Sequence, residues 1–204
     1  MCVLIYKPKG IRLDDLKVLG DCWDANSHGA GFAVVKSDNL TVVKGLMSFE
    51  DFLEAYFSMY DERLEIVLHF RLASKGSVVE HLTHPFVIGK RQPKNLIFET
   101  DKEVLFHNGT IFGLGNKDKS DTQEMAELLS ELPKKYWNKI LSLTGDKFVI
   151  ASPKKITLVG SFHKHEGVYF SNMYWSYRYR GYRGYYDTCY IDTYSSINKD
   201  KKEE

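Results

Sequence analysis

Residues 1 to 10 read MCVLIYKPKG, and this stretch determines where the fold begins. The apolar run from Cys2 to Tyr6 is closed by Pro8 and Gly10, which is typical of a short buried strand. A strand that starts at the second residue holds Cys2 on a rigid element. The sequence therefore predicts a core strand with a cysteine thiol at its N-terminal end.

Helical and β patterns follow this strand. Apolar residues recur at helical spacing up to residue 25, Ser48 with Asp51 opens a second helix, and Ser120 with Gln123 forms a capping box for a third. Helices are expected over 12–25, 48–60 and 120–132, with more helix before residue 145. Strands are expected at 2–6, 29–36, 40–46, 64–71, 95–100, 103–112, 147–153, 155–160 and 167–170.

Hairpin connections are more frequent in this pattern than a steady alternation of strand and helix. Residues 95–100 and 103–112 are interpreted as a hairpin or as two adjacent strands. The order of elements favours an α+β layered sandwich with two mainly antiparallel sheets over a doubly wound parallel sheet.

Composition limits the classes of function. The 204 residues, 43% hydrophobic, suit one domain with one sizeable core, and a net charge of +1 does not favour nucleic acid or an anionic membrane as the main partner. Three widely spaced cysteines fit neither a disulfide framework nor a zinc ribbon, which indicates a reducing compartment. No run approaches the roughly 18 apolar residues of a membrane helix. We expect a cytoplasmic protein.

Cys2 is the first candidate catalytic residue. A thiol attacks an amide as thiolate, and a pKa near 8.5 leaves little thiolate at neutral pH without a neighbouring base. The α-amino group of an N-terminal cysteine, with a pKa of roughly 7.7 to 8.0, can be that base. This requires removal of Met1. The plain alternative is a small buried residue that begins a strand.

The segment HFRLAS, residues 69 to 74, supplies candidate substrate-binding residues. Arg71 ends a strand, where its guanidinium can bind an α-carboxylate through two hydrogen bonds, and Ser74 adds a hydroxyl. His84 follows in the sequence THPF and is a further candidate. The alternative for Arg71 is a surface salt bridge.

Two more short motifs contain candidate residues. In HNG, the side-chain amide of Asn108 and the backbone N–H of Gly109 can point at one oxygen, as an oxyanion hole requires. The same Asn-Gly pair is also the commonest hairpin turn signal. In SDTQ, Asp121 can accept hydrogen bonds from a substrate ammonium, and it is also a favourable negative residue in the first turn of a helix.

Taken together, Cys2, NSHGAGFA, HFRLAS with THPF, HNG and SDT resemble, in order and spacing, the glutaminase domain of class II glutamine amidotransferases. These are N-terminal nucleophile hydrolases. The resemblance covers residues 2–171 and implies a four-layer αββα sandwich. It implies that Cys2 is nucleophile and base, that Asn108 and Gly109 form the oxyanion hole, and that glutamine is bound by Arg71, Ser74, His84 and Asp121.

The sequence departs from the family pattern at two positions. Val3 stands where family members usually have glycine, and His28-Gly29 stands where Asp-Gly is common. If Val3 packs on the buried side of its strand, the site is compatible with glutamine. If Val3 faces the substrate, a different amide is expected.

The composition changes after residue 171. We expect residues 1–171 to form the glutamine amidotransferase type 2-like domain, followed by a Tyr/Arg/Gly-rich extension, 172–204, with a disordered charged end. Tyrosine and arginine side chains in YWSYRYRGYRGYY can stack on bases, so a non-enzymatic nucleic-acid or protein-binding module is one alternative function. The plain alternative is an aromatic edge strand or packed loop.

The resemblance implies that L-glutamine or a similar amide is the substrate. No Walker A loop or phosphoribosyl-binding pattern is found, so we expect an ammonia-accepting synthase subunit as a separate partner. The enzymatic alternative is a stand-alone amidohydrolase acting on a γ-glutamyl or other amide. No cofactor is expected, and no metal site, because the pairs His81/His84 and His163/His165 have no further ligands at recognisable spacing.

Overall fold

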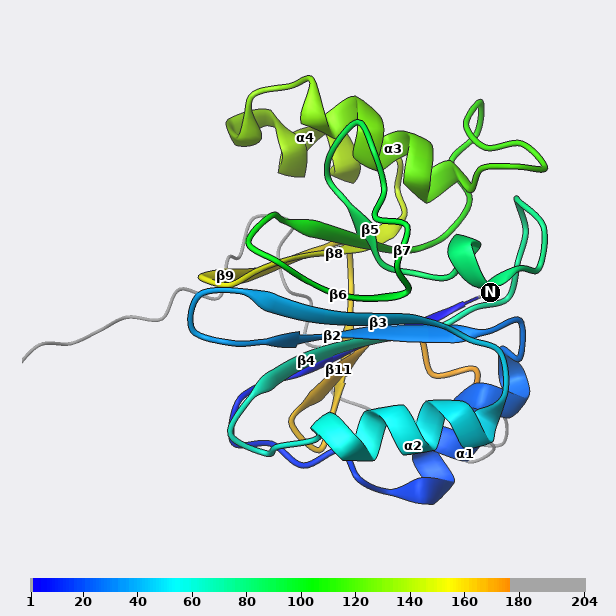
Figure 1. The fold of residues 1–204 in the computed structure, drawn as a ribbon, viewed down its shortest axis with the longest axis vertical. Helices are drawn as coiled ribbons and strands as arrows, with labels where there is room; N and C mark the ends of the chain where they lie inside the picture. Colours follow the sequence, from blue (N-terminus) through cyan, green and yellow to red (C-terminus); the bar gives the residue numbers. More distant parts are fainter. Residues whose placement is uncertain (1, 177–204) are drawn as a thin grey trace, which may run out of the picture.

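The computed structural model describes residues 2–176 of the chain, which form the layers seen in Figure 1. The helices are α1 (Leu16–Ala25), α2 (Phe49–Met59), α3 (Asp121–Ser130) and α4 (Trp137–Ser142), with 3-10 turns η1 (Glu80–Leu82) and η2 (Lys134–Tyr136). The strands are β1 (Val3–Lys7), β2 (Ala30–Val35), β3 (Leu40–Leu46), β4 (Glu65–Phe70), β5 (Phe86–Val87), β6 (Ile97–Thr100), β7 (Val104–Asn108), β8 (Lys147–Ser152), β9 (Lys155–Val159), β10 (His163–His165) and β11 (Val168–Phe170).

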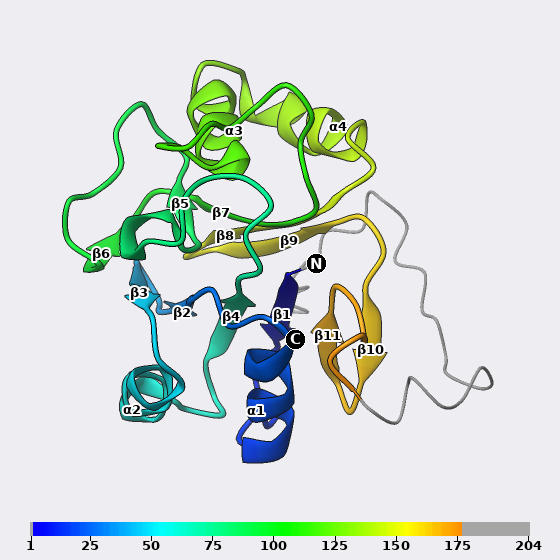
Figure 2. The same ribbon diagram turned by 90° about the vertical axis from the view of Figure 1, so that its right-hand side faces the viewer.

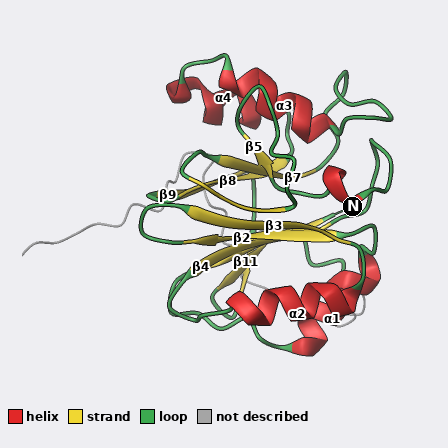
Figure 3. Ribbon diagram, in the orientation of Figure 1, coloured by secondary structure: helices red, strands yellow, loops and turns green. Residues whose placement is uncertain are grey.

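Two antiparallel sheets are stacked between two helical layers (Figures 1 and 3). The larger sheet has the order β10-β11-β1-β4-β2-β3-β6, and the smaller has the order β5-β7-β8-β9. Helices α1 and α2 cover the outer face of the larger sheet, and α3 and α4 cover the smaller one. The expected four-layer αββα sandwich is confirmed.

Strand β1 shows why the sequence folds into stacked layers. Val3 and Ile5 pack toward α1 and α2, whereas Leu4 and Tyr6 pack into the core between the sheets. Because successive side chains of a strand point to opposite faces, a strand apolar at every position is stable only when both faces are covered. The same alternation on β8 supplies the central core and the core beneath α3 and α4.

Helix starts follow the capping residues expected from the sequence. The side chains of Ser48 and Ser120 accept hydrogen bonds from the backbone N–H groups of Asp51 and Gln123, each at 3.1 Å. The first helix begins later than expected, at Leu16, because the carboxylate of Asp15 caps it.

The interpretation of residues 95–100 and 103–112 as a hairpin or adjacent strands is wrong. Strand β6 pairs with β3 in the larger sheet, whereas β7 pairs with β5 and β8 in the smaller one. Figure 2 shows β6 beside β3 at the edge of the larger sheet. The short link between the two strands passes from one sheet to the other, and β6 alternates between exposed and half-buried residues, as suits an edge strand.

The described chain continues beyond residue 171 as part of the packed structure. Met173 and Trp175 are each 5% exposed and pack into the core beneath the larger sheet. The expected domain boundary at 171/172 stays a prediction. The Tyr/Arg/Gly-rich segment from 177 onward, with the end expected to be disordered, lies outside the described residues.

Candidate active site

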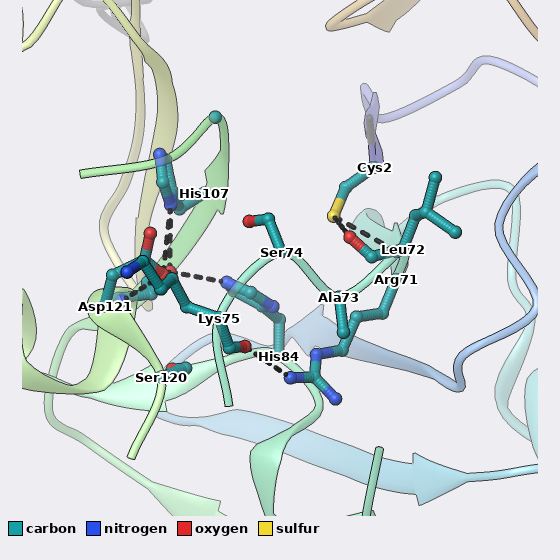
Figure 4. A pocket seen from close by; sticks show the side chains of 12 residues that line it. Cys2, Arg71, Leu72, Ala73, Ser74, Lys75, His84, His107, Ser120 and Asp121 are labelled. Carbon is teal, nitrogen blue, oxygen red and sulfur yellow. Dashed lines mark hydrogen bonds and ion pairs between the residues drawn. The ribbon is translucent and has the colours of Figure 1, made fainter. Parts of the chain in front are cut away.

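Six of the seven candidate site residues line one narrow pocket at the N-terminal end of β1 (Figure 4). They come from the chain start, the loops after β4 and β7, the segment before β5 and the start of α3: Cys2, Arg71, Ser74, His84, Gly109 and Asp121. The cavity measures about 20 Å³, room for little more than one water molecule. A substrate of amino-acid size therefore requires the lining to move apart.

The thiol of Cys2 lies against the backbone of Leu72. Its Sγ accepts a hydrogen bond from the N–H of Leu72 at 3.2 Å and lies 3.4 Å from the carbonyl oxygen of the same residue. Burial raises the pKa of Cys2, and this effect exceeds the opposing effects of the Leu72 N–H and the charge of Arg71. The buried thiol is thus protonated at neutral pH and needs a base before it can act as a nucleophile.

Arg71 directly follows β4, and hydrogen bonds hold both its backbone and its guanidinium. Its backbone N–H donates to the carbonyl of Gly29 at 2.8 Å, and its carbonyl accepts from the N–H of His28 at 2.9 Å. The guanidinium donates to the carbonyls of Ser77 at 2.8 Å and Lys75 at 3.0 Å. Only 2% of Arg71 is exposed, and within residues 2–176 it forms no ion pair, so the surface salt bridge is not what the structure contains.

Asp121 is the first residue of α3 and is tightly held. One carboxylate oxygen accepts from the N–H of Ile111 at 2.9 Å, and the other accepts from the N–H of Thr122 at 2.8 Å. A carboxylate has about four acceptor sites, so Asp121 retains capacity for a substrate cation. Asp121 is thus an acidic residue in the first turn of α3, and its role in binding a substrate ammonium stays a prediction.

A buried network of polar side chains lies beside Asp121, and its central residues, Thr122 and His107, were not among the site residues predicted from the sequence. The hydroxyl of Thr122 is 3.0 Å from Nε2 of His84 and 2.9 Å from Nδ1 of His107. Nε2 of His107 in turn is 3.2 Å from a carboxylate oxygen of Asp146. Thr122 and His107 stand within quoted motifs, but Asp146 has no motif that could have indicated it.

A second histidine pair connects this network to the larger sheet. Nε2 of His69 lies 2.9 Å from the carbonyl oxygen of His107, and the rings of His69 and His84 are 3.9 Å apart between centroids. Burial lowers the pKa of His69 to about 3 and holds that of His84 well below its usual value. Both rings are neutral at physiological pH.

Residues Asn108 and Gly109 are not part of a hairpin turn, because β7 leads into the connection to α3. A Cβ at position 109 would lie 2.1 Å from the Asp146 carboxylate, so any larger residue would displace the Asp146 side chain. Asn108 is buried but does not line the pocket. Its Nδ2 donates to the hydroxyl of Ser171 at 2.8 Å, and its Oδ1 has no hydrogen-bond partner.

Two residues after β11 hold the start of the chain in place. The hydroxyl of Ser171 accepts from the N–H of Leu4 at 2.9 Å, and the amide of Asn172 donates to the carbonyl of Cys2 at 2.7 Å. Neither residue was a sequence candidate. A Ser-Asn pair after a short strand gives no signal of this role, because the contacts span almost the whole chain.

The residues at which the sequence departs from the family pattern do not line the pocket. Val3 is fully buried in the core toward α1 and α2, so its bulk does not face the pocket. His28 is half-buried, and its Nδ1 accepts from the N–H of Ala73 at 3.0 Å, which fixes the loop between Arg71 and Ser74.

Comparison with solved structures agrees with this architecture. Glutamine phosphoribosylpyrophosphate amidotransferase from B. subtilis, solved with ADP and GMP, superposes with a TM-score of 0.56 at 18% identity over 83% of this chain. The chain has the N-terminal nucleophile hydrolase fold. A structure described as the allosteric regulatory enzyme of purine biosynthesis gives a TM-score of 0.54 at 16% identity, again over 83% of the chain. The matched part of this chain spans 41% of the length of either protein.

No family model and no curated protein sequence matches this chain. Within the described part of the chain, no three His, Cys, Asp or Glu side chains are grouped so that they could hold a metal ion. The helices of residues 2–176 are all too short or too polar to cross a membrane.

Proposed function

We propose that this chain is a class II glutamine amidotransferase-like amide hydrolase that releases ammonia from glutamine for a separate acceptor enzyme. The supporting observation is that Cys2, Arg71, Gly109 and Asp121, far apart in sequence, line one pocket of an N-terminal nucleophile hydrolase fold. Each of these groups has the chemistry that one step of glutamine hydrolysis requires.

Removal of Met1 makes the α-amino group of Cys2 the base for its own thiol. Because burial raises the pKa of this thiol, a tethered base is needed to form the thiolate at cytosolic pH. The thiolate attacks the side-chain amide carbon, the tetrahedral intermediate loses ammonia, and water hydrolyses the γ-glutamyl thioester to glutamate. The proton taken from the thiol is returned to the departing nitrogen by the same amino group.

Asn108 completes the oxyanion hole when its amide rotates by about 180°. In that orientation the hydroxyl of Ser171 donates to Oδ1, which otherwise lacks a partner, while still accepting from Leu4. Nδ2 is then released from Ser171, and in this proposal it donates to the oxyanion together with the N–H of Gly109 once the pocket, which Asn108 does not line in this structure, opens to admit the substrate. The same rotation therefore gives Oδ1 of Asn108 a hydrogen-bond partner and releases Nδ2 to act as a donor in catalysis.

Substrate recognition in this proposal relies on opposite charges. Arg71 uses two of its five N–H donors on the carbonyls of Ser77 and Lys75, so the others can bind the α-carboxylate of glutamine. Asp121 binds the α-ammonium. Ser74, whose hydroxyl is 2.9 Å from that of Thr110, and His84 complete the substrate-binding wall.

The acceptor is proposed to be a synthase subunit in the cytoplasm. The solved neighbours are more than twice as long as the part that this chain matches, and one of them is a glutamine phosphoribosylpyrophosphate amidotransferase. Among residues 2–176 the cysteines Cys2 and Cys22 are free thiols, as suits a reducing compartment.

The proposal is tested by intact mass and glutamate release from glutamine. We expect the wild type to lack Met1, to take one adduct of a glutamine-like electrophile on Cys2, and to release glutamate. Cys2→Ala should lose both adduct and turnover, by at least about 10³-fold in rate. Cys22→Ala, altered at a buried position of α1, is the matched control and should retain both. Turnover that survives in Cys2→Ala would refute the assignment.

A further inference from the structure

Behind the wall of the active-site pocket lies a second, larger cavity of about 260 Å³. It is bounded by β3, β6, the segment between η1 and β6, and the start of α3; Figure 2 shows β3 and β6 together at this edge of the larger sheet. Its lining combines cationic, amide and apolar side chains: Lys44, His81, Lys94, Leu96, Phe98 and Gln123.

The two cavities are separate sites that share a wall. His84 and Thr122 line the active-site pocket, whereas their neighbours Pro85 and Gln123 line the second cavity. A ligand in the second cavity would therefore contact no group that takes part in the proposed chemistry.

Lys44 is a buried lysine in the lining of this cavity. Only 7% of the residue is exposed, its Nζ donates to the carbonyl of Pro85 at 3.0 Å, and it lies 4.1 Å from the ring centroid of Phe86. Within residues 2–176 it forms no ion pair, and the nearby charge that acts on it is the positive Arg71. An ammonium has three donors, and a buried unpaired charge is unfavourable until an anion compensates it.

The surrounding backbone holds the cavity open around Lys44. In the β2–β3 pairing Lys44 stands opposite Gly31, where the backbone of His84 takes the place of a side chain. The N–H of Lys44 donates to the carbonyl of Leu96 at 2.9 Å, and the N–H of Gly45 donates to the hydroxyl of Thr83 at 2.7 Å. Both walls are thus tied to β3, as expected of a preformed ligand site.

From these contacts we propose that the second cavity binds a small organic anion, whose carboxylate or phosphate group pairs with Nζ of Lys44 and whose apolar part lies along Leu96 and Phe98. Lys94 at the mouth adds a second positive charge, and Gln123 can donate from α3. The mixed lining matches a ligand with one anionic end and one apolar end.

Calorimetric titration of the full chain with phenyl phosphate, benzoate and inorganic phosphate tests this site. We expect saturable binding of at least one organic anion at one site, and weaker binding of inorganic phosphate than of phenyl phosphate. Lys44→Met should weaken binding of the organic anion by roughly tenfold or more, because a charge-assisted hydrogen bond is lost. Lys17→Met, on the exposed surface of α1, should leave it unchanged.

A second variant keeps the test decisive if Lys44→Met does not fold. Phe98→Ala should bind phenyl phosphate less tightly, so that its affinity for phenyl phosphate exceeds its affinity for inorganic phosphate by less than in the wild type. The proposal is overturned if the wild type shows no saturable binding of either organic anion, or if Lys44→Met binds the organic anion as tightly as the wild type. It is also overturned if Phe98→Ala prefers phenyl phosphate to inorganic phosphate as strongly as the wild type does. None of these measurements depends on Cys2, so the result is independent of glutamine hydrolysis.

Discussion

Arg71 and Lys44 show how single residues differ in the way a buried charge is held. The guanidinium of Arg71 spans two carbonyls at the pocket, whereas the ammonium of Lys44 donates to one carbonyl in the neighbouring cavity. Burial and the charge of Arg71 lower the pKa of Lys44 to about 7. An incoming anion would therefore favour the protonated form of Lys44, whereas at the pocket it would pair with the permanent charge of Arg71.

Replacing Arg71 tests its proposed role in binding the α-carboxylate of glutamine. Arg71→Ala is expected to raise KM by about 10- to 100-fold and to lower kcat far less, because a charge-assisted interaction of roughly 1.5 to 3 kcal/mol is lost from the bound substrate. Steady-state kinetics with glutamine measure the change.

A substrate lacking the α-carboxylate provides the control for Arg71. Wild type and Arg71→Ala should use it with similar kcat/KM, since neither makes the deleted contact. If Arg71→Ala lowered both parameters equally with either substrate, Arg71 would be supporting the pocket rather than reading the carboxylate.

At the scale of elements, β2 determines where the His84–Pro85 segment can lie. A Cβ on Gly31 would approach the carbonyl oxygen of His84 to 2.0 Å, so the segment crosses the strand at van der Waals contact with bare backbone. This crossing places His84 on the active-site side and the carbonyl of Pro85 at Lys44. One glycine therefore supports both cavities.

We predict that Gly31→Ala lowers the free energy of unfolding by about 1 to 3 kcal/mol, because the added methyl displaces backbone rather than a flexible side chain. Glutamate release should fall as well. Gly20→Ala in α1 is the matched control: its Cβ would meet Phe49 at an ordinary 3.8 Å, and removing a helical glycine should stabilise by roughly 0.5 to 1 kcal/mol. Urea unfolding distinguishes the two; equal stability of both variants would contradict the close approach.

At the scale of the whole molecule, the histidine cluster connects the two sheets. His69 belongs to β4 of the larger sheet and His107 to β7 of the smaller one, and the ring of His84 lies against that of His69. The folded state keeps His69 neutral down to about pH 3, whereas an unfolded histidine takes up a proton near pH 6.5. Between these values the unfolded chain binds more protons, so stability decreases as pH falls.

The free energy of unfolding should thus fall between pH 6.5 and pH 4, with His69 contributing about 1.4 kcal/mol per pH unit well below pH 6.5. His69→Gln keeps a donor for the His107 carbonyl but cannot titrate, so its curve should be shallower by that amount. His81→Gln, at an exposed site, is the matched control. An unchanged slope in His69→Gln would mean that His69 accepts its proton in the folded protein.

Local patterns in the sequence were sufficient for the helices, for most of the strands and for most of the residues that line the pocket. The caps at Ser48 and Ser120 and the alternation in β1 depend on neighbours within a few residues, which a sequence displays directly. The ordered motifs likewise led to Cys2, Arg71 and Asp121, which the fold brings together.

Contacts between distant segments were decided only by the tertiary structure. Both faces of β1 are apolar, so periodicity alone could not say that Val3 points away from the pocket, and a short link after β6 is compatible with a hairpin as well as with a change of sheet. The holding contacts of Ser171 and Asn172, and the cavity around Lys44, arise where chain segments far apart in sequence meet. The physical reason is that periodicity specifies which residues are buried, whereas the partner of each buried group is set by long-range packing.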